Sequence, residues 1–206
     1  MKIIKINPEK PDQKDIDYAI NVLENGGIVL YPTDTIYGLA VNIFDDDALN
    51  KLYDLKKRSK RKPISICVSK LENIFQIAHI NDKFKYKIFE LLPGPFTIIL
   101  KRKENISPIL TAGGENIGIR IPDNILCQEL TKKFPITASS ANISGMPVMD
   151  NIEKILNQLS SEVDLVLDAG SLTKLEPSTV IDFSLDQPKI LRKGAGYLNS
   201  LHDMDL

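Results

Sequence analysis

The sequence has few of the residues on which disulfide frameworks, metal sites and membrane spans depend. Its two cysteines, Cys67 and Cys127, lie far apart and form no Cys-x-x-Cys pair, which argues against a disulfide framework and a structural zinc site. Its two histidines, His79 and His202, stand in unremarkable contexts, so we expect no histidine-based metal or acid–base chemistry. No apolar run approaches the length that spans a bilayer, and residues 1–6 are too short for a signal-peptide core. These absences favour a soluble cytoplasmic protein with no membrane partner and no metal site of its own.

An excess of charge of one sign is also missing. The 26 basic and 27 acidic side chains give a net charge of −1, so the global charge predicts no general affinity for nucleic acids, although a local basic face remains open. With 43% apolar residues, the 206-residue chain can build a real core. No repeat, low-complexity tract or linker divides it. We therefore expect a single domain over 1–206, with a core at about 12–196 and a fraying tail at 197–206.

The standard nucleotide-binding and hydrolase motifs are absent as well. The chain contains no G-x-x-x-x-G-K-[ST] phosphate loop, no G-x-G-x-x-G after a strand, no H-E-x-x-H and no G-x-S-x-G. If this chain uses a nucleotide, it must hold the phosphates with side chains rather than with a glycine-rich loop.

The stretch 26–40 is the one around which the rest of the chain is organised. Gly26-Gly27 can end a helix, and Ile28–Tyr31 is a β-branched and apolar run typical of a buried strand. Pro32 ends regular pairing because it lacks a backbone donor, and Thr33-Asp34-Thr35 follow it. Polar side chains at the end of a buried strand lie where open α/β sheets bind ligands. An ordinary turn with Asx and Ser/Thr hydrogen bonds is the competing interpretation.

Hydrophobic periodicity predicts helices and strands in alternation along the whole chain. We expect helices at 11–25, 45–62, 71–77, 81–92, 124–134 and 152–159. We expect strands at 3–6, 28–31, 64–68, 96–100, 117–122, 136–138, 165–167, 179–182 and 189–192. This alternation indicates an α/β domain around a twisted sheet with parallel and antiparallel pairs, flanked by helices.

Five polar or basic clusters lie at the ends of these predicted elements. They are Thr33-Asp34-Thr35, the run Lys56–Lys62 in which six of seven residues are basic, Arg120, Ser139–Asn142 and Arg192. If the fold brings them to one edge of a sheet, they form a basic pocket suited to phosphates and a carboxylate. Each cluster also has a simpler interpretation. The lysines can be solvated at a helix C-terminus, the two arginines can face solvent, and the serine segment can be a plain loop.

Six short motifs follow one another in a fixed order over roughly residues 12–196. They are Tyr31–Leu39, Lys56-x-Arg58, Pro93–Thr97, Ile117–Pro122, Ser140-Ala141-Asn142 with Gly145, and Pro177–Asp182 with Leu191–Gly194. In this order they resemble the motifs of the YrdC-like family of threonylcarbamoyl-adenylate synthases. Each motif alone is weak, but six in order are highly specific for the family.

The resemblance implies a twisted α/β sheet with a concave, positively charged cavity. It also implies a nucleotidyltransferase reaction, in which L-threonine, bicarbonate and ATP give threonylcarbamoyl-AMP and pyrophosphate. Partner proteins of a threonylcarbamoyl-transferase complex would then move the threonylcarbamoyl group to the adenosine beside the anticodon of tRNAs that read codons beginning with A. Mg²⁺ would accompany the triphosphate, and no tightly bound organic cofactor is implied.

The resemblance further implies roles for individual residues. Lys56 and Arg58 would be catalytic, because they would neutralise the phosphates of ATP and the leaving pyrophosphate. The other nucleotide contacts implied are Lys62, Asn116, Ser140, Asn142 and Arg192. The threonine contacts implied are Thr35, Cys67, Arg120 (for the carboxylate) and Ser178.

Three positions depart from the family's pattern. Lys62 stands where asparagine is usual, Cys67 where a histidine near the threonine site is common, and Asp34 where glutamate is more frequent. The second domain of the long form is not expected, because 14 residues follow Arg192.

Three alternatives remain open at this point. One is the YciO-like branch of the family, and another is a nucleotide-binding relative that uses a different acyl acceptor. The third is an RNA-binding module that uses 56–62 against the backbone, since the family's concave surface has been proposed to bind double-stranded RNA.

Overall fold

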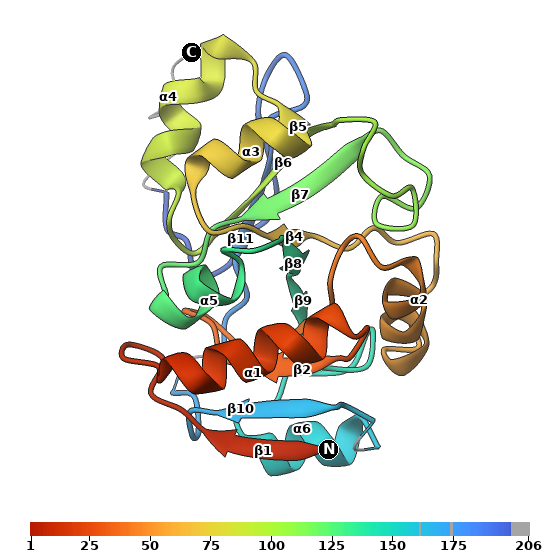
Figure 1. Cartoon of the computed structure of the whole chain (residues 1–206). Coiled ribbons are helices and arrows are strands. Elements are labelled where there is room, and N and C mark those ends of the chain that lie inside the picture. Colours follow the sequence, from red (N-terminus) through yellow and green to blue (C-terminus); the bar gives the residue numbers. More distant parts are fainter. Residues whose placement is uncertain (161, 174, 199–206) are drawn as a thin grey trace.

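The computed structural model describes residues 1–160, 162–173 and 175–198. The expected fraying tail, 197–206, falls outside the described residues from residue 199 onward. Within the described residues, strands and helices alternate along the chain (Figure 1) and form mixed parallel and antiparallel sheets flanked by helices. The predicted fold class is therefore confirmed.

The first sheet has the strand order β1-β10-β2-β3-β9. Its members are β1 (Lys2–Lys5), β10 (Leu165–Asp168), β2 (Val29–Tyr31), β3 (Gly38–Ala40) and β9 (Ser139–Ser140). The first three are parallel, whereas β3 and β9 join antiparallel. Figure 1 shows helix α1 (Gln13–Glu24) across this sheet and α6 (Ile152–Gln158) beside β1 and β10.

The second sheet has the order β12-β11-β6-β7-β4-β8, and β5 also pairs with β6. Its members are β12 (Lys189–Arg192), β11 (Thr179–Asp182), β6 (Phe96–Arg102), β7 (Asn116–Arg120), β4 (Ile66–Cys67), β8 (Ile136–Thr137) and β5 (Ala78–His79). The remaining helices are α2 (Asp46–Leu55), α3 (Leu71–Ile77), α4 (Asp82–Leu91) and α5 (Ile125–Leu130). The strands thus pair as two sheets, and the two-residue strands β8 and β9 are separated only by Ala138.

Helix α2 ends at Leu55, so the prediction that it runs on to Lys62 is wrong. Lys57 adopts a left-handed backbone conformation with φ of 47°, and the Arg58 N–H donates to the Tyr53 carbonyl at 2.9 Å. This geometry closes the last helical turn, as C-terminal capping motifs do. The rest of the basic run is therefore a loop that folds back along the helix end.

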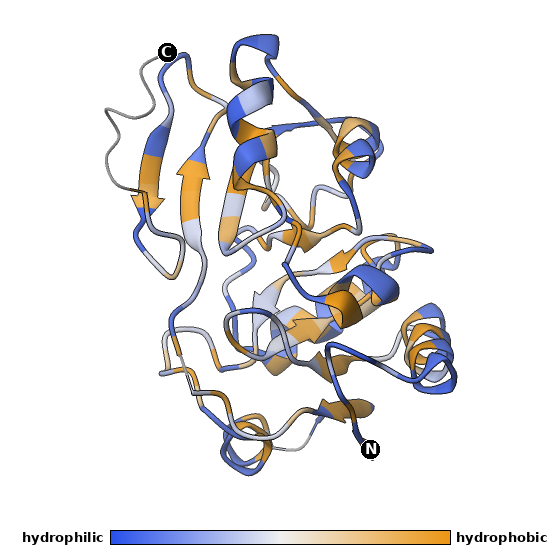
Figure 2. Cartoon of the chain, turned by 90° about the vertical axis from the view of Figure 1, so that its left-hand side faces the viewer, coloured by the Kyte–Doolittle hydropathy of each residue, from blue (hydrophilic) through white to orange (hydrophobic). Residues whose placement is uncertain are grey.

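One hydrophobic cluster extends through both sheets. It contains Leu30 and Leu39 of the first sheet together with Ile66, Ile98 and Ile119 of the second, none of which is accessible to solvent. A second cluster lies under α1 and α5. Figure 2 shows that the strands consist largely of hydrophobic residues, whereas the helices carry hydrophilic and hydrophobic residues in turn. Because one core supports both sheets, the loops at their facing ends are held in a fixed relation.

Candidate functional site

A cavity lies where the ends of strands from both sheets come together. Its volume is about 170 Å³, which is roughly ten times the ~15 Å³ that a single water molecule requires, so it holds a solute. Three arginines line it, namely Arg58, Arg120 and Arg192. The polar lining is completed by Tyr31, Thr33, Tyr37, Ser65, Thr97, Ser139, Ser140 and Ser178.

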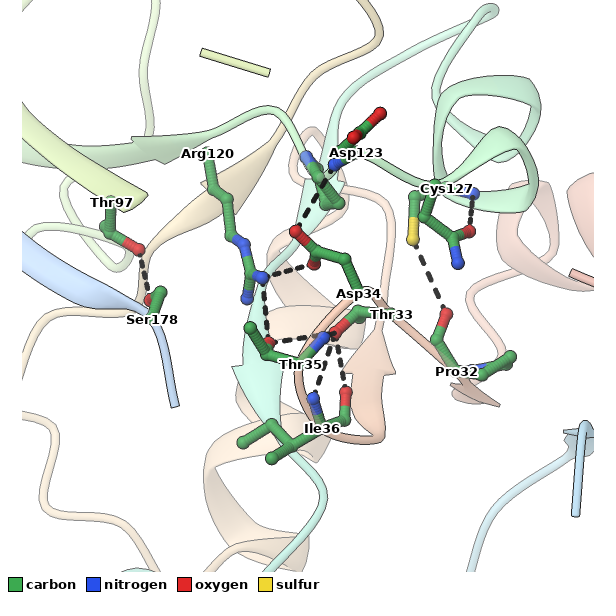
Figure 3. A network of polar contacts seen from close by, with 12 residues as sticks. Pro32, Thr33, Asp34, Thr35, Ile36, Thr97, Arg120, Asp123, Cys127 and Ser178 are labelled. Atoms are coloured by element: carbon green, nitrogen blue, oxygen red, sulfur yellow. Dashed lines mark hydrogen bonds and ion pairs between the residues drawn. The ribbon is translucent and has the colours of Figure 1, made fainter. Parts of the chain in front are cut away.

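The loop after β2 forms one wall of this cavity. The Thr33 hydroxyl donates to the Ile36 carbonyl at 2.7 Å and accepts from the Thr35 and Ile36 N–H groups at 3.1 and 3.2 Å (Figure 3). This is the hydrogen-bonded turn of the competing interpretation, and here it also shapes the cavity. Gly38 is required behind the loop, because a Cβ there would come within 2.9 Å of the Tyr31 ring.

Arg120 ends β7 and faces the cavity, so the solvent-facing alternative is wrong. Its side chain is 8% exposed; one terminal nitrogen, Nη2, donates to the Asp34 carboxylate and, at 2.8 Å, to the Thr35 hydroxyl. The other Asp34 oxygen accepts from the Asp123 N–H at 3.3 Å. The buried Nε of Arg120 has no acceptor within the described chain. A buried donor without a partner is costly, so this nitrogen favours a ligand oxygen beside it.

Arg192 and Ser178 form the opposite wall. The Arg192 guanidinium donates to the Ser178 carbonyl through Nε at 3.1 Å and through Nη2 at 2.8 Å. The Ser178 hydroxyl shares a 2.7 Å hydrogen bond with the Thr97 hydroxyl, on the far side of Arg120 from the Thr35 loop (Figure 3). Burial, and next the charge of Arg120, lower the pKa of Arg192. The two arginines therefore lie close enough to repel each other.

Arg58 is held by the loop that follows α2. Its Nε and Nη2 donate to the Lys62 and Pro63 carbonyls at 3.2 and 2.8 Å. The hydroxyl of Tyr53 lies 2.9 Å from the same Lys62 carbonyl and steadies the loop. Burial lowers the pKa of Arg58. Among the described residues, the ion pairs include none with Arg58 or Arg192, so this part of the cavity has an excess of positive charge that attracts anions.

Lys56 lies behind the cavity wall rather than on it. The residue is 1% exposed, and its ammonium donates to the Ser140 carbonyl and, at 2.6 Å, to the Asn142 carbonyl. The solvated interpretation of this lysine is therefore wrong. Burial, and next the charge of Arg58, lower the pKa of Lys56 to about 7. In this arrangement Lys56 supports the segment that presents Ser140 to the cavity.

The other expected site residues are distributed unevenly. The Thr35 hydroxyl accepts a hydrogen bond from Arg120, which lines the cavity. The Asn142 amide oxygen accepts from the Ser140 hydroxyl at 2.6 Å. Cys67 is fully buried, and burial raises the pKa of its thiol to about 12. Lys62 is exposed and takes part in the Arg58 loop through its backbone, whose carbonyl accepts from Arg58 and whose N–H donates to the Ser59 carbonyl. Asn116 begins β7, at the opposite end from Arg120.

The structure therefore does not place Cys67, Lys62 or Asn116 on the cavity lining. For Asn116 the reason is geometric, because its amide donates to the Ser184 hydroxyl at 2.9 Å at the far end of the strand. Conversely, Thr97 and Ser65 line the cavity although they were not expected to. Thr97 ends the Pro93–Thr97 motif, which is the signal that could have identified it.

Two curated relatives align with nearly the whole chain. A protein of Methanocaldococcus jannaschii, provisionally named threonylcarbamoyl-AMP synthase, is 38% identical over 94% of this chain and 92% of its own length. The threonylcarbamoyl-AMP synthase of Photobacterium profundum is 30% identical over 87% of this chain and 99% of its own length.

Two solved structures share the fold closely. One is Sua5 of Pyrococcus abyssi, complexed with L-threonine, with a TM-score of 0.88 and 28% identity over 94% of this chain. The chain spans 58% of that protein. Escherichia coli YciO has a TM-score of 0.88 and 26% identity, and the alignment covers 97% of this chain and 98% of YciO. The Sua5/YciO/YrdC family model, described as "Telomere recombination", matches residues 21–194. The chain belongs to the Sua5/YciO/YrdC family.

Proposed function

We propose that this protein synthesises threonylcarbamoyl-AMP from L-threonine, bicarbonate and ATP and releases pyrophosphate. The observation that carries this proposal is the unequal charge of the cavity. Arg58 and Arg192 have no carboxylate partner among the described residues, whereas Arg120 is paired with Asp34. Relatives that bear the name of this activity align over nearly the whole chain. The cavity thus offers one region for a polyanion and another for a singly charged group.

Arg58 and Arg192 are suited to the triphosphate. A guanidinium binds phosphate oxygens through several donors in a fixed plane, and hydrogen bonds between charged groups are stronger than neutral ones. Arg58 is half-buried, whereas Arg192 is exposed at the end of β12. Ser140 adds a hydroxyl on the same lining, and Lys56 and Asn142 hold its segment in place. Among the described residues there is no cluster of three or more metal-ligating side chains. Mg²⁺ would therefore enter as part of the substrate, coordinated by the phosphates.

Arg120 and the Thr35 loop are suited to threonine. The unpaired Nε of Arg120 offers a donor to the amino-acid carboxylate, and the nearby hydroxyls of Thr35 and Ser178 can accept from or donate to threonine's polar groups. Threonine's amine and bicarbonate form a carbamate with loss of water, and a carbamate oxygen then attacks the α-phosphorus as pyrophosphate leaves. Such a step depends mainly on positioning and on stabilisation of the developing charge, which the arginines provide.

Pyrophosphate release tests this proposal. Wild-type protein should release pyrophosphate only when ATP, threonine and bicarbonate are all present. Arg58→Gln should lower the rate at least 100-fold, whereas the matched control Arg61→Gln should not, because Arg61 is exposed and does not line the cavity. A panel of other amino acids distinguishes a relative with a different acyl acceptor. Release that is independent of threonine would reject the proposal.

We further propose that the product passes to a threonylcarbamoyl-transferase complex that modifies tRNA.

RNA binding is a second candidate function, because Lys57, Lys60 and Lys62 are exposed on the loop beside Arg58. If these lysines contact an RNA backbone, affinity for tRNA will fall steeply with salt, and neutralising all three will abolish the salt dependence. Among the described residues, no helix is long and apolar enough to cross a membrane.

A further inference from the structure

Asp34 is the one carboxylate bound to an arginine of the cavity within the described chain. It does not line the cavity itself. Its side chain is 12% exposed, and both oxygens are occupied, one by Arg120 Nη2 and the other by the Asp123 N–H at 3.3 Å. Figure 3 shows the carboxylate between the Asp123 backbone and the guanidinium. Any effect of Asp34 on a ligand must therefore act through Arg120.

The contact is one-sided. Only Nη2 of the Arg120 guanidinium has protein acceptors among the described residues, namely Asp34 and the Thr35 hydroxyl. Nε is buried without a partner. A fork-to-fork pair with Asp34 would have used two guanidinium nitrogens. The observed pair fixes the plane of the guanidinium and leaves other donors for a ligand.

Asp34 also balances charge across the cavity. Burial, and next the charge of Arg120, lower the pKa of Arg192, and both guanidinium groups line the same cavity. Removing Asp34 would leave three arginines around one cavity with no carboxylate bound to any of them, and the Thr35 hydroxyl would be the one acceptor left to the Arg120 guanidinium among the described residues. Retaining Asp34 offsets the charge of Arg120, so this guanidinium attracts a polyanion less strongly than Arg58 does, which has no carboxylate partner within the described chain.

We propose that Asp34 is a positioning residue for the amino-acid substrate: it orients the Arg120 guanidinium so that its free donors meet the substrate carboxylate. This inference rests on the proposed function for the identity of that substrate. It separates an amino-acid subsite at Arg120, which depends on Asp34, from a phosphate subsite at Arg58, which does not.

Calorimetric titration of the intact protein tests this separation. Asp34→Ala should weaken L-threonine binding more than fivefold and change pyrophosphate binding less than twofold. Asp34→Glu, which keeps the charge, should restore threonine binding to within threefold of wild type. The matched control is Asp150→Ala, because Asp150 also pairs with a cation, Lys154 at 2.9 Å, but lies outside the cavity. It should change neither affinity.

Threonine binding that falls less than fivefold in Asp34→Ala would overturn the inference. An equal loss of pyrophosphate binding would also overturn it, since that would show a general collapse of the cavity. If the wild-type protein binds no threonine, the proposed function fails, and an NMR experiment on the protein without ligand then tests the role of Asp34.

This experiment follows the Arg120 Nε–H signal in ¹⁵N–¹H spectra, where it is assigned by its loss in Arg120→Lys. In Asp34→Ala the signal should lose its protection from solvent exchange. Unchanged protection would contradict the inference.

Discussion

Lys56 should make the stability of this protein depend on pH in a way that one substitution removes. Its ammonium is almost fully buried, and burial lowers its pKa from 10.5 to about 7. The unfolded chain binds the proton more tightly than the folded chain does. Stability therefore rises with pH between about pH 7 and 10.5 and does not change through this group below that window.

The size of the effect follows from the shift. Each pKa unit corresponds to roughly 1.4 kcal/mol, and the folded-state lysine is half deprotonated already at pH 7. Raising the pH from 7 to 9 should therefore add about 2 kcal/mol to the free energy of unfolding through Lys56. Buried tyrosines and cysteines also titrate toward high pH. The measured quantity is therefore the difference between wild type and Lys56→Met, in which those shared contributions cancel.

Urea unfolding of both proteins at pH 6, 7, 8 and 9 measures this difference. Relative to Lys56→Met, the wild type should gain about 2 kcal/mol between pH 7 and 9 and little between pH 6 and 7. If the methionine variant does not fold, Lys56→Gln serves the same purpose, because it keeps a donor but does not titrate. A difference that stays constant from pH 6 to 9 would refute the reasoning, since it would mean that the ammonium is stabilised by its carbonyl partners as well as it is by water.

Three further substitutions follow from the geometry. Arg192→Gln should weaken ATP binding roughly tenfold or more, because a charge-assisted contact contributes about 1.5–3 kcal/mol. Calorimetric titration measures this change, and an unchanged affinity would mean that the phosphates bind elsewhere. Tyr53→Phe should lower the free energy of unfolding by about 1 kcal/mol, because the Tyr53 hydroxyl donates a hydrogen bond to the Lys62 carbonyl. Urea unfolding measures this change, and an increase in stability would contradict the prediction. Gly196→Ala should lower the melting temperature, because a Cβ there would come within 2.5 Å of the Phe96 ring, and a neutral result would show that the ring can move.

The sequence predicted the regular elements well where periodicity was clean. The strands β11 and β12 have the predicted bounds, 179–182 and 189–192, because each is a pair of apolar residues between polar ones, set off by turn residues such as Pro188. The short strands β3 and β9 were missed. Each has only two or three residues, and their pairing is set by contacts between segments distant in the sequence, which no local pattern encodes.

The site could be predicted only in part. The expected residues that do not line the cavity are Thr35, Lys56, Lys62, Cys67, Asn116 and Asn142. The motifs identified Arg58, Arg120 and Arg192, all of which line the cavity. The alternation of Ile119, Arg120 and Ile121 could not decide whether the arginine faces the cavity or solvent, since either face satisfies the pattern. Lys56 opens a run of basic residues, which is typical of a solvated loop. Its burial depends on two carbonyls more than eighty residues away along the chain.

The most direct test of the central claim is the identity of the product. Protein, ATP, L-threonine and ¹³C-bicarbonate are mixed, and the nucleotides are analysed by mass spectrometry. The account predicts threonylcarbamoyl-AMP that carries one ¹³C atom, formed in parallel with pyrophosphate and missing when threonine is withheld. AMP and pyrophosphate without any threonine-containing adduct, or an adduct that lacks the label, would contradict it.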